Sequence, residues 1–420
     1  MKNNKLFLIF TISLLIRLIY CFLMPNTVRL DEQRYDILSN QIINGNYNLD
    51  AISFICAPFI PYFLALIKLI STHYWQEITF ILQCILTSIA GIYLFKLTDL
   101  LFKNKQIATI SAWIYCFYPM TFYYVKNIGQ ESAYQSFLII SIYFLIKFSE
   151  LKIIKDLIIS AILFALCFLT KSFILFWSPF IVFFIFKIKE LNLKEKIINS
   201  FVFSAICLLF TMPFGFYNLQ KHKVYTISSD GLGFFFWYGN SEYAFQRDCL
   251  VNTYDINKTA EIRDTAKLIH DMSPPNVSME TYKKAFELFP SEQERQAIYK
   301  RNAWAWIEQN PRRFAELKIY SFIHFFVWGV NFKMHPLSIW LISVIIFAPL
   351  YLLAYWGVFI SIKKDFEKHN WLLSLVVAML LFSTIFAFDP RFRRITLEPF
   401  YIIYATFSAY YYVNKLKWAK

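Results

Sequence analysis

The sequence predicts an all-α protein that crosses a membrane many times. Of its 420 residues, 58% are hydrophobic and only 17% are charged, and apolar stretches recur along the whole length. Soluble domains carry about 25% charged residues. The apolar stretches reach about 18–25 residues, and about 20 residues in a helix cross the hydrocarbon core. Because they lack the alternation of a barrel strand, we expect about ten transmembrane helices together with interfacial helices.

The charge balance fits a membrane protein better than a nucleic-acid-binding one. There are 42 basic and 28 acidic residues, which gives a net charge of +14. Most of the excess falls in short loops between apolar stretches, as in the cytoplasmic loops of membrane proteins. No basic arm with interleaved aromatic residues is present, so we expect no nucleic-acid partner. The seven cysteines show no paired spacing and predict neither a disulfide framework nor a zinc site.

The chain begins with an apolar stretch that extends to about Met24. No small-residue cleavage site follows it, so we expect a retained first helix that starts in the cytoplasm. Leu30–Asn44 is polar with apolar residues at helical spacing, which predicts a helix lying at the membrane surface. Phe59–Ile70 follows two prolines and is too short to span comfortably, so we expect an interfacial or re-entrant helix.

Nine further spans are expected. They cover Ile78–Leu101, Ile107–Val125, Ser132–Phe148, Ile153–Thr170, Phe173–Phe186, Ile197–Tyr217, Leu337–Ile362, Trp371–Phe388 and Leu397–Val413. With these spans, the lysine-rich connections and both termini fall on one side, which the positive-inside rule assigns to the cytoplasm. The same order places Asp31, Glu131, Lys171 and Arg391 together on the outer face.

One long hydrophilic region, Asn218–Lys318, divides the chain. Ser291–Glu294 has the form of a helix capping box, and Asn310-Pro311 has that of an N-cap followed by a first-turn proline. We therefore expect a partly helical outer domain at residues 218–318. Before it lies an N-terminal transmembrane catalytic module at residues 1–217, with a first outer loop at 25–76. A C-terminal transmembrane segment follows at residues 319–420.

The first candidate site is the charged segment Arg29–Asp36, just after the first apolar stretch. Its adjacent carboxylates, Asp31 and Glu32, have two explanations. Carboxylates are stabilised in the first turn of any helix by the helix dipole. Alternatively they are catalytic: two adjacent carboxylates repel each other, so one of them accepts a proton more readily, as a general base must. We favour catalysis and select Asp31.

Other candidates lie at the predicted outer ends of spans, where ionisable groups are costly and often functional. Glu131 opens a span, as an ordinary first-turn carboxylate also does. Lys171 interrupts an apolar stretch, and a lysine that extends toward the membrane surface would explain it equally well. The segment Asp389–Arg394 puts three arginines on the outer face, against the usual bias. Because arginine binds phosphate through a planar fork of donors, we expect an anion site there.

Several familiar motifs are missing. Gly231-Leu-Gly233 lacks the third glycine of a dinucleotide-binding loop, because Phe236 holds that place. No glycine-rich loop ends in Lys-Ser or Lys-Thr, which argues against an ATP-driven pump. The six histidines are scattered without the spacing of metal ligands.

The order of several motifs resembles a known family. They are Asp31-Glu32-x-x-Tyr35, Asn44-Gly45-Asn46-Tyr47, Ala57-Pro58-x-x-Pro61, Pro119 to Glu131, Leu169-Thr170-Lys171, Pro213 to Asn218, Gly239-Asn240, Asn310-Pro311 and Arg391-Phe392-Arg393 followed by Glu398-Pro399. Together they resemble the integral-membrane glycosyltransferases that use polyprenyl-phosphate sugars. These include dolichyl-phosphate-mannose protein mannosyltransferases and the lipid A aminoarabinose transferase. Lys171 stands where the family usually has arginine, and Tyr217 replaces another arginine of the family.

The resemblance implies a C-type glycosyltransferase fold. It also implies a reaction that moves a sugar from a polyprenyl phosphate to a lipid, glycan or protein acceptor, with inversion at the anomeric carbon. By analogy Asp31 is the base and Glu32 supports or replaces it. The other implied roles are donor-phosphate binding by Lys171, Arg391 and Arg393, and acceptor binding or orientation by Glu131, Tyr35 and Arg34. We expect no cofactor. Relatives differ in needing a divalent metal, and only Asp31, Glu32 and Glu131 are candidate ligands here.

Two alternatives remain open. A transporter or flippase for lipid-linked glycans would carry internal repeats, and neither Asp31–Tyr35 nor Arg391–Arg394 has a second copy. A glycan polymerase or ligase would be expected to lack the Asp-Glu pair in its first loop. The lysine-rich inner loops favour a bacterial inner membrane, with both termini in the cytoplasm and the active site facing the periplasm.

Overall fold

The computed structural model describes residues 2–25, 30–45, 57–222, 225, 232–245, 249, 292–328, 337–386 and 390–418. These residues contain helices and turns and no strand. The helices are α1 (Lys2–Leu23), α2 (Leu30–Ile43), α3 (Phe59–Ile70), α4 (Trp75–Phe102), α5 (Lys105–Cys116), α6 (Pro119–Lys126), α7 (Glu131–Leu151), α8 (Ile154–Thr170), the 3-10 helix η1 (Ser172–Trp177), α9 (Ser178–Lys187), α10 (Leu193–His222), α11 (Leu232–Tyr238), α12 (Glu242–Phe245), α15 (Glu292–Gln309), α16 (Pro311–Phe326), α17 (Leu337–Lys364), α18 (Phe366–Ile385) and α19 (Pro390–Trp418).

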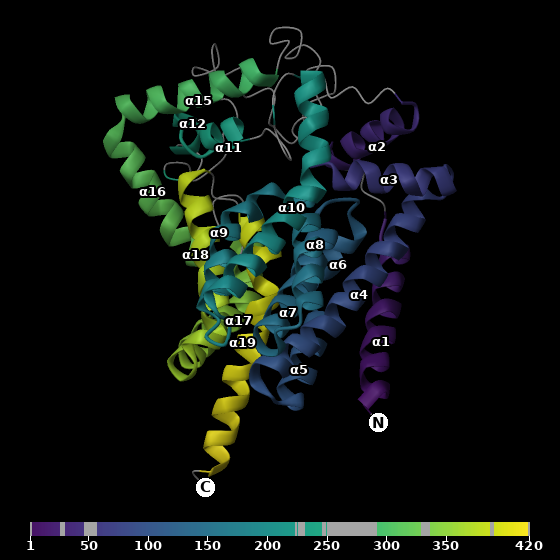
Figure 1. Cartoon of the computed structure of the whole chain (residues 1–420), viewed down its shortest axis with the longest axis vertical. Helices are drawn as coiled ribbons and strands as arrows, with labels where there is room; N and C mark the ends of the chain where they lie inside the picture. The colour runs from purple at the N-terminus through teal and green to yellow at the C-terminus, as the bar shows by residue number, and fades with distance from the viewer. Residues whose placement is uncertain are drawn as a thin grey trace.

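The long helices stand side by side as a bundle with two distinct ends (Figure 1). Both termini lie at one end, which we call the terminal end. The helices α2, α3, α11, α12 and α15 gather at the opposite end, which we call the α2 end. Both α3 and α15 lie across the bundle there rather than along it (Figure 1). Of the predicted outer domain, residues 223–224, 226–231, 246–248 and 250–291 lie outside the described residues.

Six described helices are long and apolar enough to cross a membrane: α1, α4, α7, α10, α17 and α18. The prediction of an all-α protein with several membrane spans is therefore confirmed. Two other predicted spans correspond to shorter helical segments. Helix α8 has 17 residues, and Ser172–Lys187 is a shorter apolar segment. The last helix, α19, begins at Pro390 and includes the arginines that were expected to precede it.

Residues 107–125 were predicted as one helix, and this was wrong. The structure divides them into α5 and α6, because Pro119 has no N–H to donate to the Tyr115 carbonyl. The Tyr118 N–H lies 3.3 Å from this carbonyl oxygen, and Arg17 of α1, which is fully buried, supplies a further donor. Its Nη2 donates to the Tyr115 carbonyl at 3.3 Å and to Thr121 Oγ1 at 3.0 Å. A buried guanidinium is thus matched to a helix break that exposes backbone acceptors.

Helices α7 and α19 form the centre of the bundle. The apolar segment of α7 is 78% buried, the largest share among the six candidate spans. In α19 every residue from Phe400 to Ala405 is buried. Helix α7 packs on α4 and α8, while α19 packs mainly on α17. The last helix of the chain therefore lies in the interior and contributes heavily to one large apolar core.

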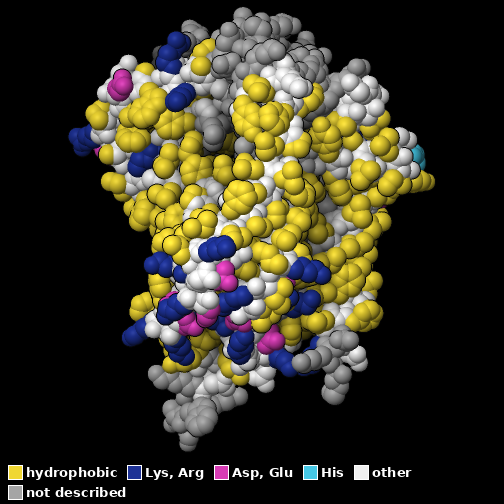
Figure 2. All heavy atoms as spheres, in the orientation of Figure 1, with side chains coloured by type: hydrophobic (Ala, Val, Ile, Leu, Met, Phe, Trp, Pro, Cys, Tyr) yellow, Lys and Arg dark blue, Asp and Glu magenta, His cyan; other side chains and the backbone are white. Residues whose placement is uncertain are grey.

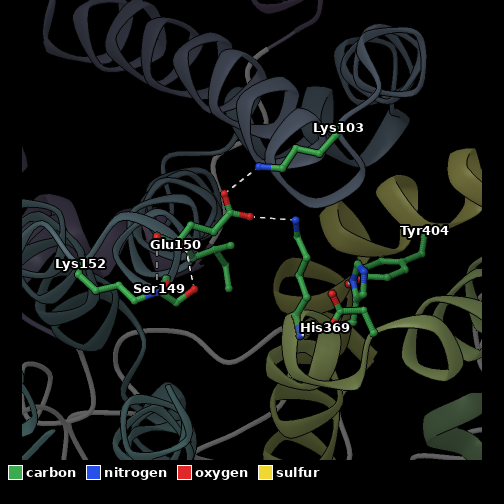
Figure 3. A network of polar contacts seen from close by, with 9 residues as sticks. Lys103, Ser149, Glu150, Lys152, His369 and Tyr404 are labelled. Carbon is green, nitrogen blue, oxygen red and sulfur yellow. Dashed lines mark hydrogen bonds and ion pairs between the residues drawn. The ribbon is translucent and has the colours of Figure 1, made fainter. Parts of the chain in front are cut away.

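Ion pairs join several loops at the terminal end. Figure 2 shows lysine, arginine and acidic side chains gathered near that end of the visible face. Glu150 of α7 binds the ammonium groups of Lys103 and Lys368, each at 2.8 Å (Figure 3). Lys368 belongs to α18, so Glu150 connects the first half of the chain to the C-terminal helices. Nearby, His369 Nδ1 and the Tyr404 hydroxyl are 2.8 Å apart, which joins α18 to α19.

The contact between α17 and α19 depends on Gly357. A Cβ atom placed there would lie 2.1 Å from the Tyr404 carbonyl oxygen, which is backbone and cannot rotate away. Gly91 of α4 provides a matched control, because its nearest neighbour would be a Tyr115 ring atom at 3.5 Å. We expect Gly357→Ala to destabilise the protein by about 1–3 kcal/mol through overpacking.

Thermal unfolding in detergent checks this. The Gly91→Ala protein should unfold at the wild-type temperature or slightly above it, because alanine favours the helix by about 1 kcal/mol. Equal unfolding temperatures for the two variants would contradict the close approach of α17 and α19.

Candidate active site

Helix α2 presents the predicted catalytic carboxylates at the α2 end. Asp31 and Glu32 both lie in its first turn, so the helix dipole stabilises them whatever else they do. The Asp31 side chain is 62% exposed, and its Oδ1 lies 3.8 Å from Nη1 of Arg34. Tyr35, one turn further along α2, is buried in the core. Asp31 is therefore accessible to a second molecule, and Arg34 is its closest charged neighbour among the described ion pairs.

Glu32 differs sharply from Asp31, because it is 9% exposed. Its Oε1 accepts a hydrogen bond of 2.8 Å from the backbone N–H of Ile128. Ile128 lies between α6 and α7, three residues before Glu131. The Glu32 carboxylate therefore attaches the start of α2 to the loop that leads into α7. This contact suits a positioning role.

Glu131 and Lys171 form an ion pair of 3.1 Å, with side chains that are 22% and 12% exposed. Glu131 begins α7, and Lys171 lies at the junction of α8 and η1. The Lys171 ammonium also lies 5.8 Å from the centre of the Phe392 ring, and Phe392 directly follows Arg391 in the sequence. Arg391 itself attracts the Glu131 carboxylate electrostatically. Three segments far apart in the sequence thus bring two cations and one carboxylate together.

Arg393 occupies a different environment. It is 1% exposed, and its Nη1 donates to the Phe325 carbonyl and to the Val327 carbonyl at 2.8 Å. These carbonyls are at the C-terminus of α16, where helices leave acceptors unpaired. The contacts favour a capping role, and phosphate binding by Arg393 stays a prediction. The exposed Arg391 is better placed for a ligand.

A buried carboxylate that belongs to the last motif of the sequence analysis, but was given no role there, supports the first turns of α19. Glu398 accepts hydrogen bonds of 2.6 Å from the hydroxyls of Tyr118 and Tyr351. Its Oε1 also lies 3.8 Å from Nε of Arg394. Through these contacts α19 is fixed to α17 and to the break between α5 and α6. The feature of the sequence that could have indicated Glu398 is a Glu-Pro pair inside an apolar segment.

Two further buried charges were also missed, Arg17 and Lys68. Each is a lone basic residue inside an apolar stretch, and this pattern in the sequence identifies them. Asp36 binds Lys68, so the charged segment has a structural partner as well as candidate catalytic groups. Among the described residues, no group of three or more histidine, cysteine or acidic side chains is arranged to hold a metal ion.

Comparison with known proteins places this geometry in context. Residues 56–217 match the family model described as dolichyl-phosphate-mannose-protein mannosyltransferase. The resemblance predicted from the sequence is confirmed over that segment. It supports a membrane glycosyltransferase of the mannosyltransferase type. The segment contains Glu131 and Lys171 but neither Asp31 nor Arg391. No curated protein sequence matches the chain.

The position of the Glu131 carboxylate depends on Gly129. A Cβ atom at residue 129 would lie 2.7 Å from Glu131 Oε2, the mobile end of a side chain. We expect Gly129→Ala to leave the fold intact but to move the carboxylate away from Lys171. The loss of this partly buried contact should lower the free energy of unfolding by about 1–3 kcal/mol.

A double-mutant cycle in detergent measures this effect. In a Glu131→Ala background the displaced atom is absent, so Gly129→Ala should then have almost no effect on the unfolding temperature. If Gly129→Ala costs the same stability in both backgrounds, the contact with Glu131 is not the cause.

Proposed function

We propose that the protein transfers a sugar from a polyprenyl-phosphate donor to an acceptor on the outer face of the membrane. The observation that carries the proposal is the junction of Glu131, Lys171 and Arg391 at the α2 end. Two of these residues, Glu131 and Lys171, lie inside the segment that matches the mannosyltransferase family model. Cations beside a membrane-embedded helix bundle suit a lipid phosphate, because they stabilise charge that grows on a leaving group.

In the proposed reaction, the hydroxyl or amine of the acceptor loses its proton to the Asp31 carboxylate. The acceptor atom forms a bond to the anomeric carbon as the bond from that carbon to the phosphate oxygen breaks. The electron pair of the breaking bond stays with the phosphate, which leaves as polyprenyl phosphate. A single displacement of this kind inverts the anomeric centre. Phosphate is a good leaving group, so a strong general acid is not required.

The roles of the side chains follow from their surroundings. Lys171 and Arg391 hold the phosphate, and Glu131 fixes the Lys171 ammonium between the end of α8 and the start of α7. Asp31 is exposed enough to meet an acceptor, and Arg34 and Tyr35 orient it on α2. Glu32 supports the base by attaching α2 to the loop before α7. The acceptor is a lipid, a glycan or a protein.

The proposed location is a bacterial inner membrane. The lysine-rich loops lie toward the terminal end, so this end faces the cytoplasm if the positive-inside rule holds. The α2 end then faces the periplasm, and a lipid-linked donor reaches it within the outer leaflet. Mass spectrometry of protease-treated spheroplasts would identify the exposed end.

The first test is transfer of radiolabelled sugar from polyprenyl phosphates carrying mannose, glucose or aminoarabinose to any acceptor in native membranes. We expect Asp31→Asn, which keeps the shape and removes the base, to lower the rate by at least about a hundredfold. Glu77→Gln is the matched control, because Glu77 is also a first-turn carboxylate at the α2 end.

The outcomes separate the competing functions. Full activity of Asp31→Asn would show that Asp31 is an ordinary helix-start carboxylate. If the wild-type protein moves labelled lipid-linked sugar across vesicle membranes without transferring it, the flippase alternative replaces the proposal. Formation of long glycan chains from lipid-linked units would favour a polymerase.

A second test addresses metal dependence. Two of the three candidate carboxylate ligands already bind protein groups, Glu32 an N–H and Glu131 an ammonium. We therefore expect transfer to continue at the same rate after treatment with EDTA. A loss of activity that magnesium or manganese restores would contradict this expectation and assign a metal to the site.

A further inference from the structure

The most completely bonded charge at the α2 end is an ammonium group. Lys68 lies in α3, which is otherwise almost entirely apolar, and it is 5% exposed. All its hydrogen-bond acceptors belong to α2: the Asp36 carboxylate, the Asp36 carbonyl at 3.2 Å, Ser39 Oγ at 2.7 Å and Asn40 Oδ1 at 2.8 Å. The ammonium also lies 4.7 Å from the centre of the Trp75 ring, which belongs to α4.

This arrangement suits a structural anchor rather than a ligand site. An ammonium has three protons, and the four acceptors surround it on one side while the indole covers another. Little of it remains available to a phosphate. The acceptors come from two successive turns of α2, so Lys68 fixes both the distance between α2 and α3 and the rotation of α2 about its own axis.

Two polar contacts among the described residues attach α2 to the rest of the bundle. Its main packing partner is α3, and Lys68 is the charged contact within that interface. At the other end of α2, Glu32 accepts the Ile128 N–H. Asp31 is adjacent to Glu32, and a helix turns by about 100° per residue. When Glu32 faces the loop, Asp31 therefore faces outward, and this orientation holds only while α2 cannot rotate.

We propose that Lys68 is a positioning residue for the reaction. It holds α2 so that Asp31 keeps a fixed orientation relative to the loop that leads into Glu131. This inference rests on the proposed function, because it gives Asp31 a catalytic role. A displacement of about 1 Å in a reacting group can cost about a hundredfold in rate.

The test compares Lys68→Met, which keeps the length and removes the charge, with Lys96→Met. Lys96 of α4 is a matched control. Its ammonium also lies over an aromatic ring, 4.5 Å from the centre of the Tyr93 ring, but no hydrogen bond or ion pair among the described residues joins it to α2. Initial rates are measured over a range of donor concentrations in native membranes. We expect Lys68→Met to lower kcat by about a hundredfold with little change in the donor KM, since Lys68 does not touch the donor.

A second measurement does not depend on catalysis. Spin labels on cysteines introduced at Asn44 and Tyr123, with the native cysteines replaced, report the distance between α2 and α6. The distance distribution should broaden or shift in Lys68→Met and stay narrow in Lys96→Met. An unchanged distribution in Lys68→Met would overturn the proposal outright.

The remaining outcomes separate this inference from the proposed function. If α2 moves and kcat falls, the positioning role is supported. If α2 moves and kcat is unchanged while Asp31→Asn is inactive, the positioning role fails and the base assignment stands. If α2 moves and neither variant loses activity, the base assignment has failed, and with it the reason for Lys68 to position α2.

Discussion

The structure depends on one constraint: a charge or a backbone acceptor that is removed from water needs a partner inside the protein. Pro119 leaves the Tyr115 carbonyl without its helical donor, and the buried Arg17 provides a donor in addition to the Tyr118 N–H. The end of α16 leaves carbonyls unpaired, and Arg393 provides the donor there. In both places a buried arginine donates to a backbone carbonyl at the end of a helix, so each group satisfies the other. These contacts fix how the helices cross.

The same constraint explains why the candidate site lies where it does. Lys171 interrupts an apolar segment, and the residue that neutralises it, Glu131, begins a different helix. Arg391 lies in the first turn of α19, next to Phe392, whose ring centre is 5.8 Å from the Lys171 ammonium. The family match covers the first two residues and stops at residue 217, whereas the proposed site draws on all three segments. The proposed site therefore includes a C-terminal helix that lies outside the matched segment.

The sequence predicted the kind of fold and much of the candidate site, because hydropathy and lone charges are local signals. It predicted Asn310 as an N-cap followed by Pro311 at the start of α16, which is confirmed. It did not predict that Pro119 would divide a span, since hydropathy continues unchanged across the break. It also could not separate Arg391 from Arg393. Their neighbours in sequence are alike, and only the position of α16 buries one of them.

The burial of α19 has a consequence for biosynthesis. This helix leaves the ribosome after all the other described helices, yet its side chains fill the interior of the bundle. The earlier helices can pack on one another, as α7 does on α4 and α8, but their interior stays incomplete until α19 is inserted. If the α2 end is periplasmic, the arginines at the start of α19 must also be translocated against the usual charge bias. Their acceptors, the carbonyls at the end of α16 and the Glu398 carboxylate, make that final step favourable.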